Sequence, residues 1–250
     1  MSIIKSIIQH DLRRLIANHK IWYCLAVLQT MLAVIFNWLI NSFLKLQINS
    51  KGLHYGITEE VLHPFYASFS LMVLLVLPMF AVQTICAEKQ QGTMLNFYCA
   101  PIKLSKLMLA KFCSGSIVLL LLLSWISCMP LTIIKPNLLD WGQFFSILCG
   151  VYLMLNTALA ICLGLATYMQ NVSRANVLIF LALLTAILLE WAAHYMGRYG
   201  IFMQMFSLLY PLKPFLAGII NPRAIAVYLL MIIGFLSIGS MRLEQRRQHG

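Results

Sequence analysis

The chain has 250 residues, of which 61% are hydrophobic and 10% are charged. Soluble domains carry about 45 to 50% apolar and about 25% charged residues, so the composition excludes an ordinary soluble domain and favours a chain embedded in lipid. The net charge of +11 would suggest nucleic-acid binding in a soluble protein. Here the basic residues stand mostly at the ends of apolar runs, where they meet anionic headgroups. We therefore expect membrane lipids as partners and no nucleic acid.

Residues 1–20 are predicted to form an amphipathic helix along the membrane surface. Ile4, Ile8 and Leu12 recur at helical spacing, and Arg13 lies on the other side. Charged residues interrupt this stretch, so it does not resemble a cleaved signal peptide. The alternative is a plain cytosolic start to the first span.

Six apolar runs follow, each suited to crossing a hydrocarbon layer about 30 Å thick. The predicted spans are residues 21–44, 64–86, 109–134, 142–168, 176–193 and 225–241. The expected fold class is an all-α integral membrane protein with a single transmembrane domain over residues 1–250. Six spans place both termini on the same side.

The Lys and Arg residues between the spans predict the orientation. With the N-terminus inside, twelve of the 18 basic residues lie on the inner side, namely Lys5, Arg13, Arg14, Lys20, Lys89, Lys103, Lys106, Lys111, Arg174, Arg242, Arg246 and Arg247. The outer side then holds Lys45, Lys51, Lys135, Arg198, Lys213 and Arg223. The positive-inside rule favours cytoplasmic N- and C-termini.

The connection at residues 87–108 is predicted to be a cytoplasmic elbow. It carries charges and surrounds a short amphipathic piece, Met94 to Tyr98, with Gly92 and Pro101. Glycine permits a turn, and proline discourages helix continuation, so the elbow can project from the bundle as a rigid lever.

The connection at residues 194–223 is predicted to form short re-entrant helices on the external side. It is too apolar for an ordinary loop, yet glycines and prolines break it repeatedly. A seventh full span through Ile201 to Ile220 is the alternative. Pro211, Lys213 and Pro214 would then fall near its middle, at a cost of several kcal/mol.

No site for nucleotide or metal is evident in the sequence. A Gly-rich loop ending in Gly-Lys-Ser or Gly-Lys-Thr, which would cradle phosphates, is absent. The seven Cys are scattered without the spacing of metal ligands, and the His and carboxylates form no catalytic pattern. We expect no enzyme activity and no metal or cofactor in this chain. If transport is driven by ATP, a partner subunit must bind ATP and Mg²⁺.

Glu190 is the one carboxylate inside an apolar run. An ionised side chain costs at least about 2.5 to 3.5 kcal/mol at the membrane centre, so Glu190 needs a partner or water. His194 and Arg198 follow at i+4 and i+8, on the same face of a continued helix. The three residues either line a translocation path or outer gate, or form a structural ion pair at the outer interface.

Other polar residues within spans are predicted to pack against helices. Asn37 and Asn41 share one face of the first span, and Asn156, Ala160 and Gly164 form a small-residue stripe in the fourth. Lining of a translocation path is the alternative for Asn37 and Asn41, since a dimer interface in lipid would use the same residues.

The region after the second span carries a motif. It reads Ala87-Glu88-Lys89-Gln90-Gln91-Gly92-Thr93, followed by Leu95, Ala100-Pro101 and Leu109-Ala110-Lys111. This resembles the signature after the second span of type-2 ATP-binding-cassette (ABC) exporter permeases. A second stretch, Tyr210-Pro211 through Phe215 with Gly218, Ile219 and Asn221, resembles the segment before the last span in permeases of the gliding-motility and nitrous-oxide-reductase-maturation type.

The resemblance implies a half-transporter in the bacterial cytoplasmic (inner) membrane. Two copies, or one copy and a paralogue, would sit on two cytosolic ABC ATPase subunits and export a substrate, with a periplasmic or accessory protein as a further partner. By the same resemblance, residues 195–223 would close the outer gate. ATPase coupling would fall to Glu88, Lys89, Gly92, Thr93, Leu95 and Pro101.

Two other functions are compatible with a membrane helix bundle. An ABC-type assembly system, such as a haem-handling subunit of cytochrome c biogenesis, would favour external surfaces rich in His or Trp, whereas only His54, His63 and His194 lie in or beside the predicted external regions. A passive channel leaves the elbow motif unexplained. Apolar walls suit a lipid, a hydrophobic peptide, a drug or a lipid-linked glycan, and no residue chooses among these.

Overall fold

The computed structural model describes residues 8–9, 13, 19–49, 56–90, 92, 104–133, 140–195, 204 and 207–249. The regular elements in these ranges are helices: α2 (His19–Asn49), the π-helical turn η1 (Thr58–Leu62), α3 (His63–Gln90), α5 (Leu104–Ile133), α6 (Trp141–Ala166), α7 (Val172–Tyr195), the 3-10 turn η4 (Tyr210–Leu212), α9 (Lys213–Leu216) and α10 (Pro222–His249). The predicted surface helix at 1–20 lies almost entirely outside the described residues.

Within the described ranges, six helices are long and apolar enough to cross a membrane. They are Trp22–Ile48, Thr58–Gln90, Leu104–Leu131, Trp141–Ala166, Val172–Glu190 and Pro222–Gln245. This confirms the six predicted apolar runs and the all-α class. The bounds differ in places: α6 ends at Ala166, before the predicted residue 168, whereas α10 continues past residue 241 to His249. Arg242, Arg246 and Arg247, which form the basic tail of α10, therefore belong to the last helix.

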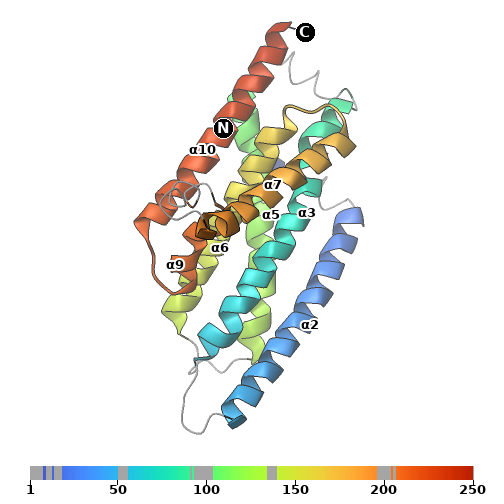
Figure 1. Ribbon diagram of the computed structural model, residues 1–250. Coiled ribbons are helices and arrows are strands. Elements are labelled where there is room, and N and C mark those ends of the chain that lie inside the picture. The colour runs from blue at the N-terminus through green and yellow to red at the C-terminus, as the bar shows by residue number, and fades with distance from the viewer. Residues whose placement is uncertain are drawn as a thin grey trace.

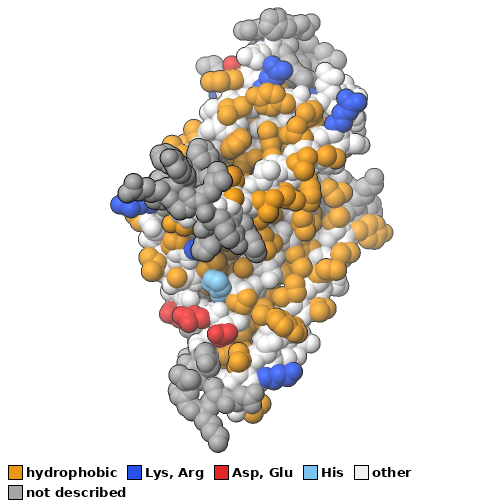
Figure 2. Space-filling view, viewed as in Figure 1, with side chains coloured by type: hydrophobic (Ala, Val, Ile, Leu, Met, Phe, Trp, Pro, Cys, Tyr) orange, Lys and Arg blue, Asp and Glu red, His pale blue; other side chains and the backbone are white. Residues whose placement is uncertain are grey.

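The long helices run side by side, with α6 inside the bundle and α2 at its edge (Figure 1). In the most apolar stretch of α6, 78% of the residues are buried, whereas the figure for α2 is 22%. Exposed hydrophobic side chains cover the visible face of the bundle (Figure 2). An apolar surface of this extent is a lipid-facing or protein-facing one.

Helix α6 occupies the centre because small residues let its neighbours approach closely. A Cβ added to Gly164 would lie 2.8 Å from the backbone oxygen of Phe235 in α10, and one added to Gly239 would lie 3.3 Å from the Cα of Gly164. Ala160 and Asn156 are buried in the same helix. The predicted packing role of this small-residue stripe is confirmed.

The segment 207–221 consists of short turns that fold back onto α6. The Nε2 of Gln143 donates to the carbonyl of Leu216 at 3.2 Å, and the hydroxyl of Ser146 donates to that of Phe215 at 3.1 Å. Gly150 faces Phe215, whose side chain fills the place of a Cβ. Protein groups thus satisfy backbone that a broken helix leaves unpaired. The described part of this segment contains no seventh span.

Candidate functional site

One end of the bundle collects the C-terminal ends of α3, α6 and α10 with the N-terminal ends of α5 and α7 (Figure 1). We call it the basic end. It is defined by Lys89, Lys106, Lys111, Arg174 and Arg242. The two helices that flank the predicted elbow, α3 and α5, both terminate here.

A buried ion pair joins the two helices that flank the elbow. The Nζ of Lys111 in α5 lies 2.8 Å from the Oε2 of Glu88 in α3, and their side chains are 1% and 5% exposed. The same ammonium donates to the backbone carbonyl of Thr84 at 2.8 Å. Because removing one partner of such a pair leaves an uncompensated buried charge, the pair holds the ends of α3 and α5 together.

The next residue, Lys89, ties α3 to the C-terminal end of α6. Its Nζ donates to the carbonyls of Ala166 at 3.4 Å, Thr167 at 2.7 Å and Met169 at 3.3 Å. The thiol of Cys86 also donates to Ala166, at 3.3 Å. The last carbonyls of a helix lack intrahelical partners and carry partial negative charge, so a lysine there is favourable.

The start of α10's basic tail is attached to the same end. The guanidinium of Arg242 lies 5.3 Å from the ring centroid of Tyr168, in the turn after α6, and its Nη1 donates to the Oε1 of Gln245 at 3.1 Å. An arginine over an aromatic ring contributes about 0.5 to 1 kcal/mol when exposed and more when desolvated. The ends of α3, α5, α6 and α10 therefore form one connected block.

Gly92 follows the end of α3 and has a left-handed backbone conformation. Its φ is +70°, and its N–H donates to the carbonyl of Lys89 at 3.3 Å. A glycine in the left-handed region after a helix is a common way to end it. Thr93, Leu95 and Pro101 lie outside the described residues.

The side chains of Glu88 and Lys89 contact neighbouring parts of the bundle: Glu88 pairs with Lys111 in α5, and Lys89 donates to the carbonyls at the end of α6. Both belong to α3, so the predicted elbow 87–108 begins and ends inside helices, with α3 extending to Gln90 and α5 starting at Leu104. Their assignment to ATPase coupling stays a prediction, and their contacts join the end of α3 to α5 and to the end of α6.

Glu190, near the end of α7, pairs with a lysine in the connection 194–223. Its Oε1 lies 2.6 Å from the Nζ of Lys213 in α9, and the side chains are 16% and 63% exposed. The Lys213 ammonium also lies 5.9 Å from the ring centroid of Tyr210. The side chain of His194 and all of Arg198 lie outside the described residues, so the predicted ladder on one helix face stays a prediction.

The Glu190–Lys213 pair is expected to contribute little to stability. We expect Lys213→Met to change the free energy of unfolding by less than about 1 kcal/mol, because half-exposed ion pairs are screened. Chemical unfolding of the detergent-solubilised chain measures it. A loss of several kcal/mol would contradict this reading and would indicate that the pair is shielded.

Asn37 and Asn41 lie on the exposed face of α2. The Nδ2 of Asn41 donates to the Oδ1 of Asn37 at 3.1 Å, and both residues are exposed. Both side chains therefore lie away from the helices that α2 contacts in this chain. Their lining of a translocation path stays a prediction.

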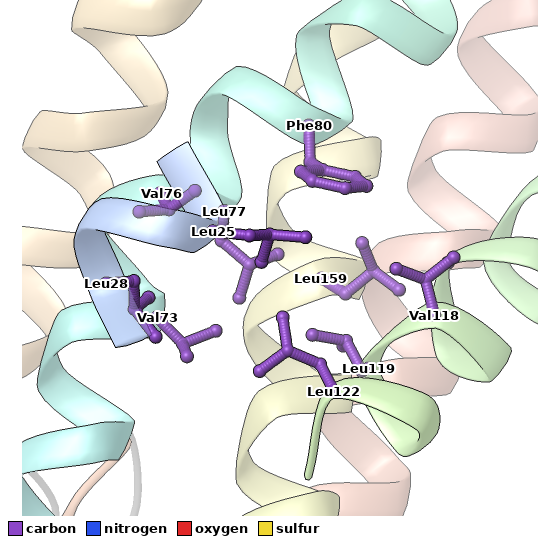
Figure 3. Close-up of a pocket in the computed structure, with 11 residues that line it drawn as sticks. Leu25, Leu28, Val73, Val76, Leu77, Phe80, Val118, Leu119, Leu122 and Leu159 are labelled. Carbon is purple, nitrogen blue, oxygen red and sulfur yellow. The ribbon is translucent and has the colours of Figure 1, made fainter. Parts of the chain in front are cut away.

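An apolar pocket of about 30 Å³ lies among α2, α3, α5 and α6 (Figure 3). Leu28, Val73, Val118 and Leu159 are among the side chains that line it, together with Gly115. The lining offers water and polar ligands nothing to bond, so we interpret the pocket as a packing gap between lipid-embedded helices.

The described residues contain no group of three or more His, Cys, Asp or Glu that could hold a metal ion. The predicted lack of metal and cofactor stays a prediction for the whole chain. Comparison of the sequence with models of known protein families and with curated protein sequences gives no match.

Proposed function

We propose that this chain is the transmembrane permease subunit of an ATP-driven exporter in the bacterial cytoplasmic membrane, with the basic end facing the cytosol. The observation that supports the proposal is that the two helices on either side of the predicted elbow are fixed to each other and to α6. These helices are joined by the buried Glu88–Lys111 pair, and Lys89 connects them to α6. The resemblance of the same segment to ABC exporter permeases names the partner as a cytosolic ATPase.

This fixed arrangement of the helices suits the transmission of force. A push on a flexible loop is absorbed by local bending, whereas a push on an elbow held at both ends displaces α3 and α5 together. Lys89 connects α3 to α6, and α6 packs closely on α10 at Gly164, so the displacement of α3 and α5 would be passed on to α6 and α10 as a rigid-body motion. Alternating access then follows when ATP draws two partner subunits together.

The segment 207–221 is the candidate for the outer gate. It is built from short turns held to α6 by side-chain hydrogen bonds, and the half-exposed Glu190–Lys213 pair connects it to α7. Half-exposed pairs of this kind are weak, so the contact with α7 can open at low cost while the contact with α6 is kept.

The positive-inside rule supports the orientation. Lys89, Lys106, Lys111, Arg174 and Arg242 lie at the basic end, whereas Lys45 lies near the C-terminal end of α2, and Lys213 and Arg223 lie in α9 and in the first turn of α10. Both termini would then be cytoplasmic.

The direct test is purification of the chain with and without the products of neighbouring genes. We expect the chain alone to hydrolyse no ATP, and we expect an ATPase containing a Gly-Lys-Ser/Thr phosphate loop to co-purify with it. Robust hydrolysis by the chain alone would overturn the proposal. Co-purification of a haem-binding protein in place of an exporter substrate would favour the assembly-system alternative.

Replacing the elbow glycine separates coupling from folding. Gly92→Pro forces φ from +70° to about −65° and removes the N–H that bonds Lys89, so the elbow leaves α3 in a different direction. We expect the amount of substrate transported per ATP hydrolysed to fall at least about tenfold. The reason is that a displaced elbow no longer meets the partner subunit in the required geometry.

The control is Gly56→Pro, at an exposed glycine before η1 on the opposite side of the bundle. It should leave transport and ATP hydrolysis coupled. Melting temperatures of both variants check that the bundle is intact. Unimpaired coupling in Gly92→Pro would exclude the elbow as the lever.

A further inference from the structure

Helix α2 uses one face to join the bundle and leaves the opposite face uncovered. Leu32, Phe36 and Phe43 are buried against the neighbouring helices. On the other side, Val34 is 70% exposed, and α2 stands at the edge of the bundle (Figure 1).

The uncovered face has the repeat of a coiled-coil seam. One series of exposed residues at successive spacings of three and four contains both asparagines, namely Val27, Thr30, Val34, Asn37, Asn41 and Leu44. A spacing that averages 3.5 residues can keep such a stripe facing a partner helix in a left-handed supercoil.

The two asparagines of this seam would keep unsatisfied hydrogen-bonding groups if the seam faced only lipid. They lie in the middle part of the span Trp22–Ile48. The single hydrogen bond between them, from the Nδ2 of Asn41 to the Oδ1 of Asn37, uses one donor and one acceptor. An amide has two donors and two lone pairs, so the Nδ2 of Asn37 and the Oδ1 of Asn41 retain bonding capacity that hydrocarbon cannot satisfy.

We propose that α2 of a second copy of this chain covers the seam, in a parallel pair around a two-fold axis normal to the membrane. Two copies inserted in the same orientation present their α2 helices parallel. A two-fold axis sets each residue opposite its own counterpart, and an amide is complementary to itself because it donates and accepts. Polar Asn at seam positions is also the device that fixes register and a two-stranded state.

This inference rests on the proposed function, which expects a dimer, and it names α2 as the contact between the two copies. Its test needs neither the ATPase nor the substrate. In a variant with all seven Cys changed to Ala, we would compare Val34→Cys, on the seam, with Met31→Cys, which is 56% exposed but off the seam. Oxidation in native membranes should give a disulfide-linked homodimer with Val34→Cys and at least about tenfold less with Met31→Cys. Equal yields, no dimer with Val34→Cys, or linkage to a different polypeptide would overturn the proposal.

A second measurement keeps the native cysteines and so does not depend on folding of the Cys-free variant. Asn37→Leu with Asn41→Leu should weaken self-association in lipid vesicles about fivefold, measured by energy transfer between labelled chains, because interhelical hydrogen bonds in membranes contribute about 1 kcal/mol. Gln47→Leu, at an exposed polar residue of α2 outside the seam, is the matched control. Unchanged association in the double variant would exclude the asparagine contact. A dimer that forms while no ATPase co-purifies would support this inference and count against the proposed function.

Discussion

Lys111→Met is expected to destabilise the bundle by about 3 to 5 kcal/mol, because it removes the ammonium that lies against the buried carboxylate of Glu88. Glu88 is 5% exposed at the side chain, and its Oε2 lies 2.8 Å from the ammonium that the substitution removes. The carbonyl of Thr84 loses a donor at the same time. Unfolding in mixed detergent micelles, followed by circular dichroism, measures the loss.

Two further variants identify the cause. Lys106→Met removes a charge from an exposed position in the first turn of the same helix and should cost less than about 0.5 kcal/mol. Glu88→Leu combined with Lys111→Met removes both charges and should recover most of the stability, since a buried pair is often replaceable by apolar side chains. Equal losses for Lys111→Met and Lys106→Met would show that the Glu88 carboxylate is hydrated.

Gly164→Leu is expected to cost about 3 kcal/mol, because no space exists for a side chain between α6 and α10. Even a single Cβ at this position would lie 2.8 Å from the carbonyl oxygen of Phe235 and 3.5 Å from its carbonyl carbon. These are backbone atoms of a helix and cannot rotate away, so α10 as a whole must move. The effect should appear both as a lower unfolding free energy and as a larger hydrodynamic size.

Gly234→Leu is the matched control in α10. A Cβ there has nothing within 4 Å, so leucine should be tolerated and should gain the roughly 0.5 to 1 kcal/mol by which glycine weakens a helix. If both variants were equally stable, α6 and α10 would be farther apart than the contact between Gly164 and Phe235 indicates.

The sequence was sufficient to predict the helices but not their polar contacts. Length and hydropathy decide whether a segment can cross a membrane, and the six runs follow from that alone. The stripe containing Asn156 and Gly164 was predictable for the same reason, since small residues at four-residue spacing permit close packing.

The pairs that hold the helix ends together required tertiary structure. Lys111 lies inside the predicted span 109–134, and a charge there signals a partner, yet the sequence does not say which carboxylate it is. Glu88, in α3, is 23 positions away. For Glu190 the sequence predicts His194 and Arg198 on its own helix face as neighbours, whereas it pairs with Lys213, which belongs to a separate short helix. Spacing along one helix is visible in a sequence, but contacts between helices depend on their rotation and depth.

The most direct test is to identify, by crosslinking in living cells, the protein that contacts the elbow after α3. A photo-crosslinking amino acid at Gln90, the exposed last residue of α3, reports on that surface without disturbing Gly92. We predict that mass spectrometry of the product will identify a cytosolic polypeptide with a Gly-rich phosphate loop. Capture of a periplasmic protein, or modification of a cysteine at position 90 by a membrane-impermeant reagent added outside intact spheroplasts, would place the basic end on the wrong side and contradict the account.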